Sequence, residues 1–136
     1  MKQLNFLKLL SLVMFSIFSS CSTPSFEETI DGKQSDTIGL SINDTTVDSN
    51  GKQLTATTQG MNWKFSEIYD NGKMIEFENQ TTLPFSINGE WFSIVKQSET
   101  KFAINVSPNK TGKCRVLEIV MVDRNYSCRL NISQNK

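Results

Sequence analysis

Apolar and polar residues alternate in short runs from residue 38 to the end of the chain, and this pattern limits the possible folds more than any other property of the sequence. The clearest run is Lys101 to Ser107, where Phe102, Ile104 and Val106 occupy every second position. Successive side chains of a β-strand point to opposite faces, so this period of two predicts a strand with one buried face. No segment beyond the first twenty residues has a helical period. We therefore expect an all-β domain.

Asn-Gly pairs separate several of these runs, at Asn50-Gly51, Asn71-Gly72 and Asn88-Gly89. Asn-Gly readily adopts the positive φ angles of a tight type I′ turn, so each pair predicts a hairpin. Short strands spaced about ten residues apart are typical of an antiparallel sandwich or a small barrel. The expected strands are residues 38–42, 52–58, 62–68, 73–78, 84–88, 91–96, 100–107, 114–122 and 126–133.

The expected strand at 114–122 is apolar on both faces, with Leu117 and Ile119 on one parity and Val116, Val120 and Val122 on the other. An exposed strand with two apolar faces promotes aggregation. We expect this strand to be central in its sheet, and the alternative is that one face binds a partner.

The amino terminus resembles an export signal. Lys2 and Lys8 give a positive start, Leu9 to Phe18 is apolar apart from serine, and Ser19-Ser20-Cys21 follows. The apolar stretch is well short of the roughly 20 residues that span a bilayer. Small residues before a cysteine resemble the bacterial lipobox, although Phe18 stands where leucine is usual. We expect residues 1–20 to be a lipoprotein signal peptide and Cys21 to be lipidated, and the alternatives are ordinary cleavage or an uncleaved anchor.

This signal predicts a protein that is lipid-anchored in a bacterial cell envelope, at the outer membrane, on its periplasmic or surface face. Residues 21–36 are polar and rich in turn-forming residues, as is typical of a flexible linker, and residues 37–134 hold the β domain. The chain has no histidine, which excludes imidazole bases and histidine metal ligands. Its 14 basic and 14 acidic residues are interspersed, so no nucleic-acid partner is expected.

An exported protein often contains disulfides, and Cys114 and Cys128 remain if Cys21 carries lipid. The expected hairpin places Cys128 opposite residues 119–121, on the order of 17 Å or more along the strand from Cys114. A disulfide cannot span that distance. We predict two unpaired thiols and no disulfide.

Several motifs in the second half of the chain occur in a recognisable order. They are Trp91-Phe92-Ser93-Ile94, the stretch from Val106 through Pro108 to Gly112, Arg115-Val116-Leu117-Glu118-Ile119, and the closing Ile132-Ser133-Gln134. Together they resemble the BACON domain, the Bacteroidetes-associated carbohydrate-binding often N-terminal domain. The resemblance covers residues 85–134 well and 38–68 loosely.

This resemblance implies an immunoglobulin-like antiparallel β-sandwich on an exported and often lipid-anchored protein, with glycan or mucin as the ligand. The shared motifs describe strand ends and a turn, so they imply no catalytic residue. In the bacterial group that the family suggests, Asp36-Thr37-Ile38 and Asp44-Thr45-Thr46 resemble O-glycosylation sites, with Thr37 and Thr45 as the modified residues.

Aromatic side chains are the candidate ligand-binding residues, because the apolar face of a sugar stacks on an aromatic ring. Each ring could instead belong to the core, and this is the stronger expectation for the two tryptophans. The two tyrosines lie next to expected turns, where exposure is common. The candidates are Trp63, Tyr69, Trp91 and Tyr126, with Phe92 beside them.

Glu76 and Glu78 share one face of an expected strand at a spacing that glycosidases also use, but Ile75 and Phe77 occupy the opposite face and a solvated charged surface is the expected interpretation. No nucleophile elbow, phosphate loop or Cys-x-x-Cys occurs. We expect no enzymatic activity, no cofactor and no metal. The predicted function is binding of glycan or mucin at the envelope, and the alternative is a structural or assembly role through contact with another envelope protein.

Overall fold

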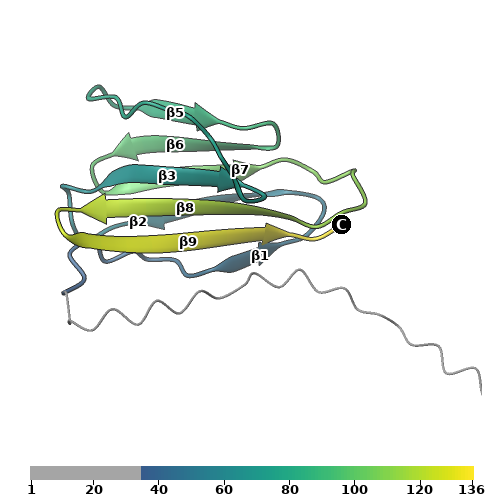
Figure 1. The fold of residues 1–136 in the computed structure, drawn as a ribbon, viewed down its shortest axis with the longest axis horizontal. Helices are drawn as coiled ribbons and strands as arrows, with labels where there is room; N and C mark the ends of the chain where they lie inside the picture. Colours follow the sequence, from purple (N-terminus) through teal and green to yellow (C-terminus); the bar gives the residue numbers. More distant parts are fainter. Residues whose placement is uncertain (1–34) are drawn as a thin grey trace, which may run out of the picture.

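The computed structural model describes residues 35–136, which form two β-sheets packed face to face (Figure 1). The first sheet contains, in spatial order, β1 (Thr45–Val47), β9 (Tyr126–Gln134), β8 (Arg115–Asp123), β3 (Lys64–Asp70) and β4 (Lys73–Met74). The second contains β2 (Lys52–Thr57), β7 (Lys101–Val106), β6 (Phe92–Ser98) and β5 (Phe85–Asn88).

The order of the strands is that of an immunoglobulin-like fold. β2, β7 and β6 take the places of strands B, E and D, while β9, β8, β3 and β4 take those of G, F, C and C′. Every pair of neighbouring strands is antiparallel except β1 and β9, which are parallel. The predicted all-β, immunoglobulin-like sandwich is confirmed.

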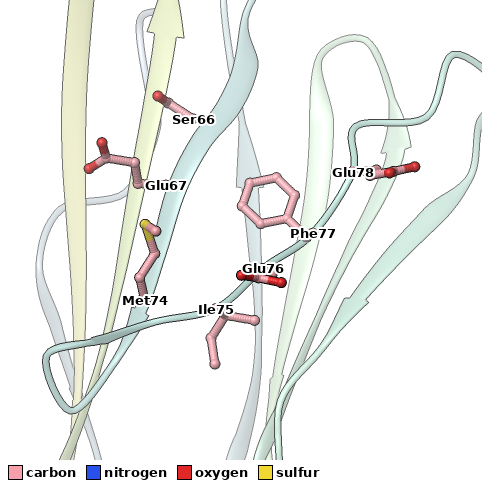
Figure 2. A pocket seen from close by; sticks show the side chains of 7 residues that line it. All are labelled: Ser66, Glu67, Met74, Ile75, Glu76, Phe77 and Glu78. Atoms are coloured by element: carbon pink, nitrogen blue, oxygen red, sulfur yellow. The ribbon is translucent and has the colours of Figure 1, made fainter.

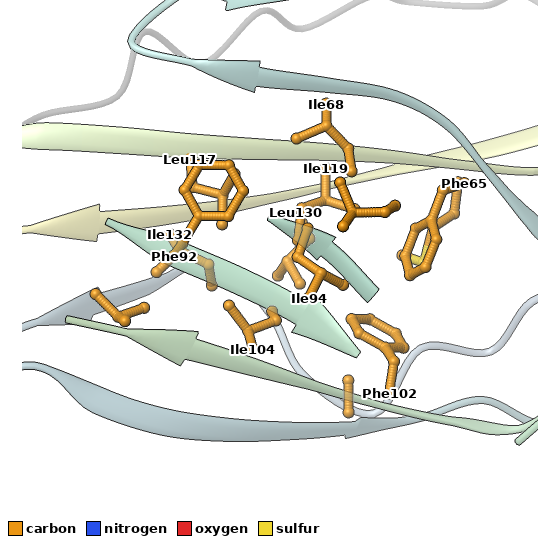
Figure 3. Close-up of a cluster of buried hydrophobic side chains, with 14 of the residues drawn as sticks. Phe65, Ile68, Phe92, Ile94, Phe102, Ile104, Leu117, Ile119, Leu130 and Ile132 are labelled. Carbon is orange, nitrogen blue, oxygen red and sulfur yellow. The ribbon is translucent and has the colours of Figure 1, made fainter. Parts of the chain in front are cut away.

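The core lies between the sheets and is filled by alternate residues of both (Figure 3). Phe65 of β3 and Phe102 of β7 are fully buried, and their ring centres lie 5.4 Å apart in an edge-to-face contact. β8 has β9 on one side and β3 on the other, and even the outward-facing Val120 is only 9% exposed. The predicted central position of this strand is confirmed.

Some predicted strand boundaries are wrong. Residues 38–42 are not a strand; they make isolated backbone bonds, such as Gln59 N to Ile38 O at 2.9 Å and Ser41 N to Thr57 O at 2.9 Å. The short strand β1 was not expected, and the strand predicted at 73–78 ends at Met74. Isolated bonds leave residues 38–42 without a continuous ladder on either side.

The three Asn-Gly pairs behave differently. Asn71 and Gly72 have φ angles of 49° and 81° and form the predicted tight turn between β3 and β4. Asn88-Gly89 also lies in a hairpin, but Gly89 is required for space, since an added Cβ would overlap the ring of Phe92. The hairpin predicted at Asn50-Gly51 is wrong, because β1 and β2 belong to different sheets.

The cysteines agree with the geometric argument only in part. Cys128 lies opposite Met121 in the β8–β9 ladder, as expected, and has a free thiol. Cys114, however, is disulfide-bonded, so the prediction that no disulfide forms is wrong. The distance argument excluded Cys128 as its partner, and the third cysteine, Cys21, lies outside the described residues.

The predicted signal peptide (1–20), the lipidated Cys21 and most of the linker (21–36) also lie outside the described residues. Within residues 35–136 there is no helix that is long and apolar enough to cross a membrane.

Candidate binding pocket at the β8–β9 turn

Trp63 is a core residue and not an exposed platform. It precedes β3, is 2% exposed, and donates a 2.8 Å hydrogen bond from its indole nitrogen to Thr58 Oγ1. The ammonium group of Lys96 lies 3.8 Å from the centre of the ring. Because both faces and the polar edge of the indole are engaged or buried, the prediction of Trp63 as a ligand-binding residue is wrong.

Trp91 is also part of the core. It is 5% exposed, and its indole nitrogen donates a 2.8 Å hydrogen bond to Asp70 Oδ1. The guanidinium carbon of Arg115 lies 4.5 Å from the ring centre, and the buried ring of Phe92 meets it edge to face. The prediction of Trp91 as a ligand-binding residue is therefore wrong.

The motifs that carry the family resemblance come together at the Trp91 end of the sandwich. Arg115 donates from Nε to Gln134 Oε1 at 2.8 Å and from Nη2 to the carbonyls of Ser107 and Pro108, both at 3.1 Å. Gln134 is fully buried and donates from Nε2 to Asp48 O at 3.1 Å. These residues close one end of the two-sheet core, which is a structural role.

Tyr69 is half-buried on the outer face of the five-stranded sheet. It lies opposite Met74 on one side and Glu118 on the other, and its hydroxyl donates a 2.7 Å hydrogen bond to Glu67 Oε2. The hydrogen bond to Glu67 raises the pKa of Tyr69 above its ordinary value, with burial and the charge of that carboxylate adding to the effect. The ring lies on the outer face and not among the core rings.

Tyr126 begins β9 and lines a pocket of about 260 Å³ at the opposite end of the sandwich from Trp91. β8 and β9 are joined there by a two-residue turn, with Asp123 paired to Tyr126 and Arg124 at a positive φ of 55°. The described chain begins at the same end (Figure 1). The pocket is lined by Ser35, Thr37, Asp123, Arg124, Asn125 and Tyr126.

Asp123 is the unusual member of this pocket. It is only 8% exposed, and its Oδ1 atom is buried with no hydrogen-bond partner within residues 35–136. An ionised carboxylate only accepts hydrogen bonds, and leaving a buried acceptor unpaired costs about 1–3 kcal/mol. The Oδ1 atom therefore offers an acceptor position that no donor among residues 35–136 fills.

Asp36 holds the other wall of the pocket in place. Its Oδ1 accepts hydrogen bonds from the backbone nitrogens of Ile38 at 2.9 Å and Gly39 at 2.8 Å. Burial raises the pKa of Tyr126, and the charge and hydrogen bond of Asp36 raise it further. The ordinary pKa of 10.0 already keeps the phenol protonated at neutral pH, and the shift extends this to higher pH.

The pocket combines an aromatic ring, a carboxylate acceptor, an amide, a guanidinium group and two hydroxyls within a space suited to one small polar ligand. Such a set fits a hydroxyl-rich molecule, since the ring packs on C–H groups while the polar side chains bond the hydroxyls. Asp123 was missed at the level of sequence. The sequence did contain a signal. Asp123 follows Leu117, Ile119 and Met121 at every second position, so a charged residue falls on the buried face of β8.

The four candidate aromatics do not form one platform. Trp63 and Tyr126 belong to one end of the sandwich, where β8 ends and β9 begins. Tyr69 and Trp91 lie toward the other end, near Asp70. Only Tyr126 of the four lines the pocket.

The two candidate O-glycosylation residues differ in their surroundings. Thr37 is exposed and contributes to the pocket. Thr45 is half-buried in β1, and its hydroxyl donates a 2.8 Å hydrogen bond to Asn43 O.

No protein-family model matches the chain, and no curated protein matches it. Among solved structures, it is similar to the NMR structure of a protein from Bacteroides thetaiotaomicron, with a TM-score of 0.56 and 15% identity over 85% of this chain and 97% of that one. Titin domain M7 aligns with a TM-score of 0.47 and 14% identity over 76% and 97%. An endo-fucoidan hydrolase of glycoside hydrolase family 107 aligns with a TM-score of 0.43 and 10% identity over 76% of this chain and 14% of that one. The Bacteroides likeness supports the fold and nothing further.

Proposed function

We propose that this protein is a non-enzymatic, lipid-anchored protein of a bacterial cell envelope whose immunoglobulin-like domain, similar to the BACON domain, binds glycan. The observation that carries the proposal is the pocket at the β8–β9 turn, which Asp123 and Tyr126 both line and where Oδ1 of the buried Asp123 has no donor among residues 35–136. Sugar hydroxyls supply such donors, and a sugar ring supplies the C–H face that packs on a phenol.

The anchor is proposed from the lipobox-like Ser19-Ser20-Cys21. A lipid thioether and a disulfide would use the same sulfur, so lipidation of Cys21 excludes a bond between it and Cys114. Mass spectrometry of the protein extracted from membranes decides the point. A diacylglyceryl group on the Cys21 peptide supports the anchor, whereas a Cys21–Cys114 linked peptide without lipid contradicts it.

Glycan binding is tested with the full chain, extracted in detergent, on an array of glycans. Tyr126→Ala should abolish the signal, because Tyr126 lines the pocket, while Tyr69→Ala should leave it unchanged, because Tyr69 lies on the outer sheet face. Circular dichroism of both variants controls for unfolding. Absence of any glycan signal, or an equal loss with the two variants, would contradict the proposal.

Modification of Thr37 and Thr45 is a separate proposal, based on the Asp-Thr patterns. Thr37 lines the pocket, so a glycan attached there would occupy the space of a ligand. Intact-mass measurements on wild type and the Thr37→Ala and Thr45→Ala variants would detect the modification. An unmodified mass for the native protein would contradict it.

A further inference from the structure

We propose that a second site, the groove beside β3, binds an extended basic segment of a partner protein, which adds to β3 as an extra strand. The groove has a volume of about 530 Å³ and lies where the chain leaves the first sheet after β4 (Figure 2). It is lined by Ser66, Glu67, Met74, Ile75, Glu76, Phe77 and Glu78.

The edge of β3 is open along part of this groove. β4 pairs only with Tyr69 and Asp70, and one more backbone bond joins Ile75 N to Ile68 O at 2.8 Å. From Lys64 to Glu67, no strand of the described chain pairs with this side of β3. An uncovered strand edge is a template for an added strand.

One contact shows that this edge accepts hydrogen bonds. The side-chain amide of Asn79 donates a 2.7 Å hydrogen bond to Phe65 O. A backbone N–H of a neighbouring strand would make the same kind of bond. Asn79 occupies this carbonyl, so an added strand must displace its side chain to make that bond.

The negative charge of the groove favours a basic occupant. Three of its seven lining residues are glutamates, Glu67, Glu76 and Glu78, and none is basic. The salt bridge between Arg129 and Glu118 involves none of the three, and Glu67 accepts a hydrogen bond from the Tyr69 hydroxyl. Lys64 and Lys73 belong to β3 and β4 but do not line the groove. An occupant with lysine or arginine side chains complements this field.

The groove also offers apolar contact. Met74 is 57% exposed, although large apolar side chains in the rest of the domain are mostly buried. Ile75 and Phe77 are half-buried and pack against the core. A strand alternates its side chains between two faces, so a segment in which basic and apolar residues alternate can meet both the carboxylates and these apolar groups.

The test uses a capped heptapeptide of alternating lysine and valine, titrated into the isotope-labelled full chain in detergent and followed by NMR. We expect saturable shifts in the amides of residues 64–67 and 74–79, and slower hydrogen exchange at Ser66. Salt at about 0.5 M should weaken binding, because the interaction is between exposed charges. A heptapeptide of alternating glutamate and valine should not bind.

A double variant, Glu76→Gln with Glu78→Gln, should weaken the lysine peptide about three- to tenfold, as expected for two exposed charge pairs. Both glutamates are exposed, so the variant keeps its fold. The matched control is Glu90→Gln with Glu99→Gln, two exposed acids outside the groove. No binding, equal binding of both peptides, shifts centred elsewhere, or equal effects of the two double variants would overturn the proposal. None of these outcomes depends on glycan binding at the β8–β9 turn.

Discussion

The indole nitrogen of Trp91 donates a 2.8 Å hydrogen bond to Asp70 Oδ1, which links the residue before β6 in one sheet to the end of β3 in the other. Arg115 lies over the same indole ring, 4.5 Å from its centre. Trp91 is thus engaged at its polar edge and on one face. A tryptophan held in this way joins the two sheets and is not available to stack on a ligand.

This bond predicts the effect of Trp91→Phe. The variant keeps an aromatic ring but removes the donor to Asp70, so the free energy of unfolding should fall by about 1–3 kcal/mol. Urea denaturation followed by circular dichroism measures the change. Tyr69→Phe, which removes a part-buried hydrogen bond to Glu67 on the outer sheet face, is the control and should cost less than Trp91→Phe. Equal stability of the wild type and Trp91→Phe would show that the bond contributes nothing.

Lys96 predicts a dependence of stability on pH. Its ammonium group donates a 3.0 Å hydrogen bond to Trp63 O, and burial lowers its pKa from the ordinary 10.5. Between the folded pKa and 10.5 the unfolded chain binds more protons than the folded one, so this group makes the fold more stable as pH rises through that window. Below the folded pKa, Lys96 is protonated in both states, and this gain in the free energy of unfolding is absent.

Lys96→Met isolates this effect, because it keeps the chain length and removes the charge. The difference in unfolding free energy, wild type minus variant, should increase from pH 7 toward pH 10.5. Subtracting the variant removes contributions from the tyrosines, which titrate in both proteins. A difference that stays constant with pH would contradict the account.

Much of the fold could be predicted from the sequence because it depends on local alternation. Seven of the nine predicted strands match observed ones closely, the one predicted at 73–78 shares only its first two residues with β4, and β8 is central because both of its faces are apolar. β1 was not predictable, since three residues, Thr45 to Val47, carry too little pattern and are held by parallel pairing with a strand more than eighty residues away.

The candidate site was less predictable. Sequence position indicated correctly that Tyr126 lies beside a turn. Both tryptophans are buried, because the core requires large rings. The pattern placed the charge of Asp123 on the buried face of β8, but only the structure shows that its Oδ1 atom has no partner among residues 35–136. The disulfide of Cys114 was missed because the geometric argument considered one partner alone.

Asp123→Asn should make the domain more stable and a poorer binder. The substitution replaces a buried carboxyl group, whose Oδ1 atom has no hydrogen-bond partner among residues 35–136, with an amide of the same shape, so the free energy of unfolding should rise by about 1 kcal/mol. Thermal and urea denaturation measure the gain, with the exposed Glu99→Gln as the control. A less stable Asp123→Asn protein would mean that the carboxylate has a structural partner.

Cys128 should react slowly while the domain is folded. It is half-buried, and burial together with the charge of Asp36 raises the pKa of its thiol to about 11. Only the thiolate is nucleophilic, so iodoacetamide at pH 8 should modify it far more slowly in buffer than in urea. Peptide mapping distinguishes Cys128 from Cys114. Rapid modification of Cys128 in the folded protein would contradict the expected protection of its thiol by burial.

Glycan binding at the β8–β9 turn can be tested by an NMR titration of the isotope-labelled full chain with the strongest glycan from the array. We expect saturable shifts centred on Thr37 and on Asp123 through Tyr126, which disappear in Asp123→Asn. Shifts centred on the groove beside β3, or on the outer face around Tyr69, would contradict it.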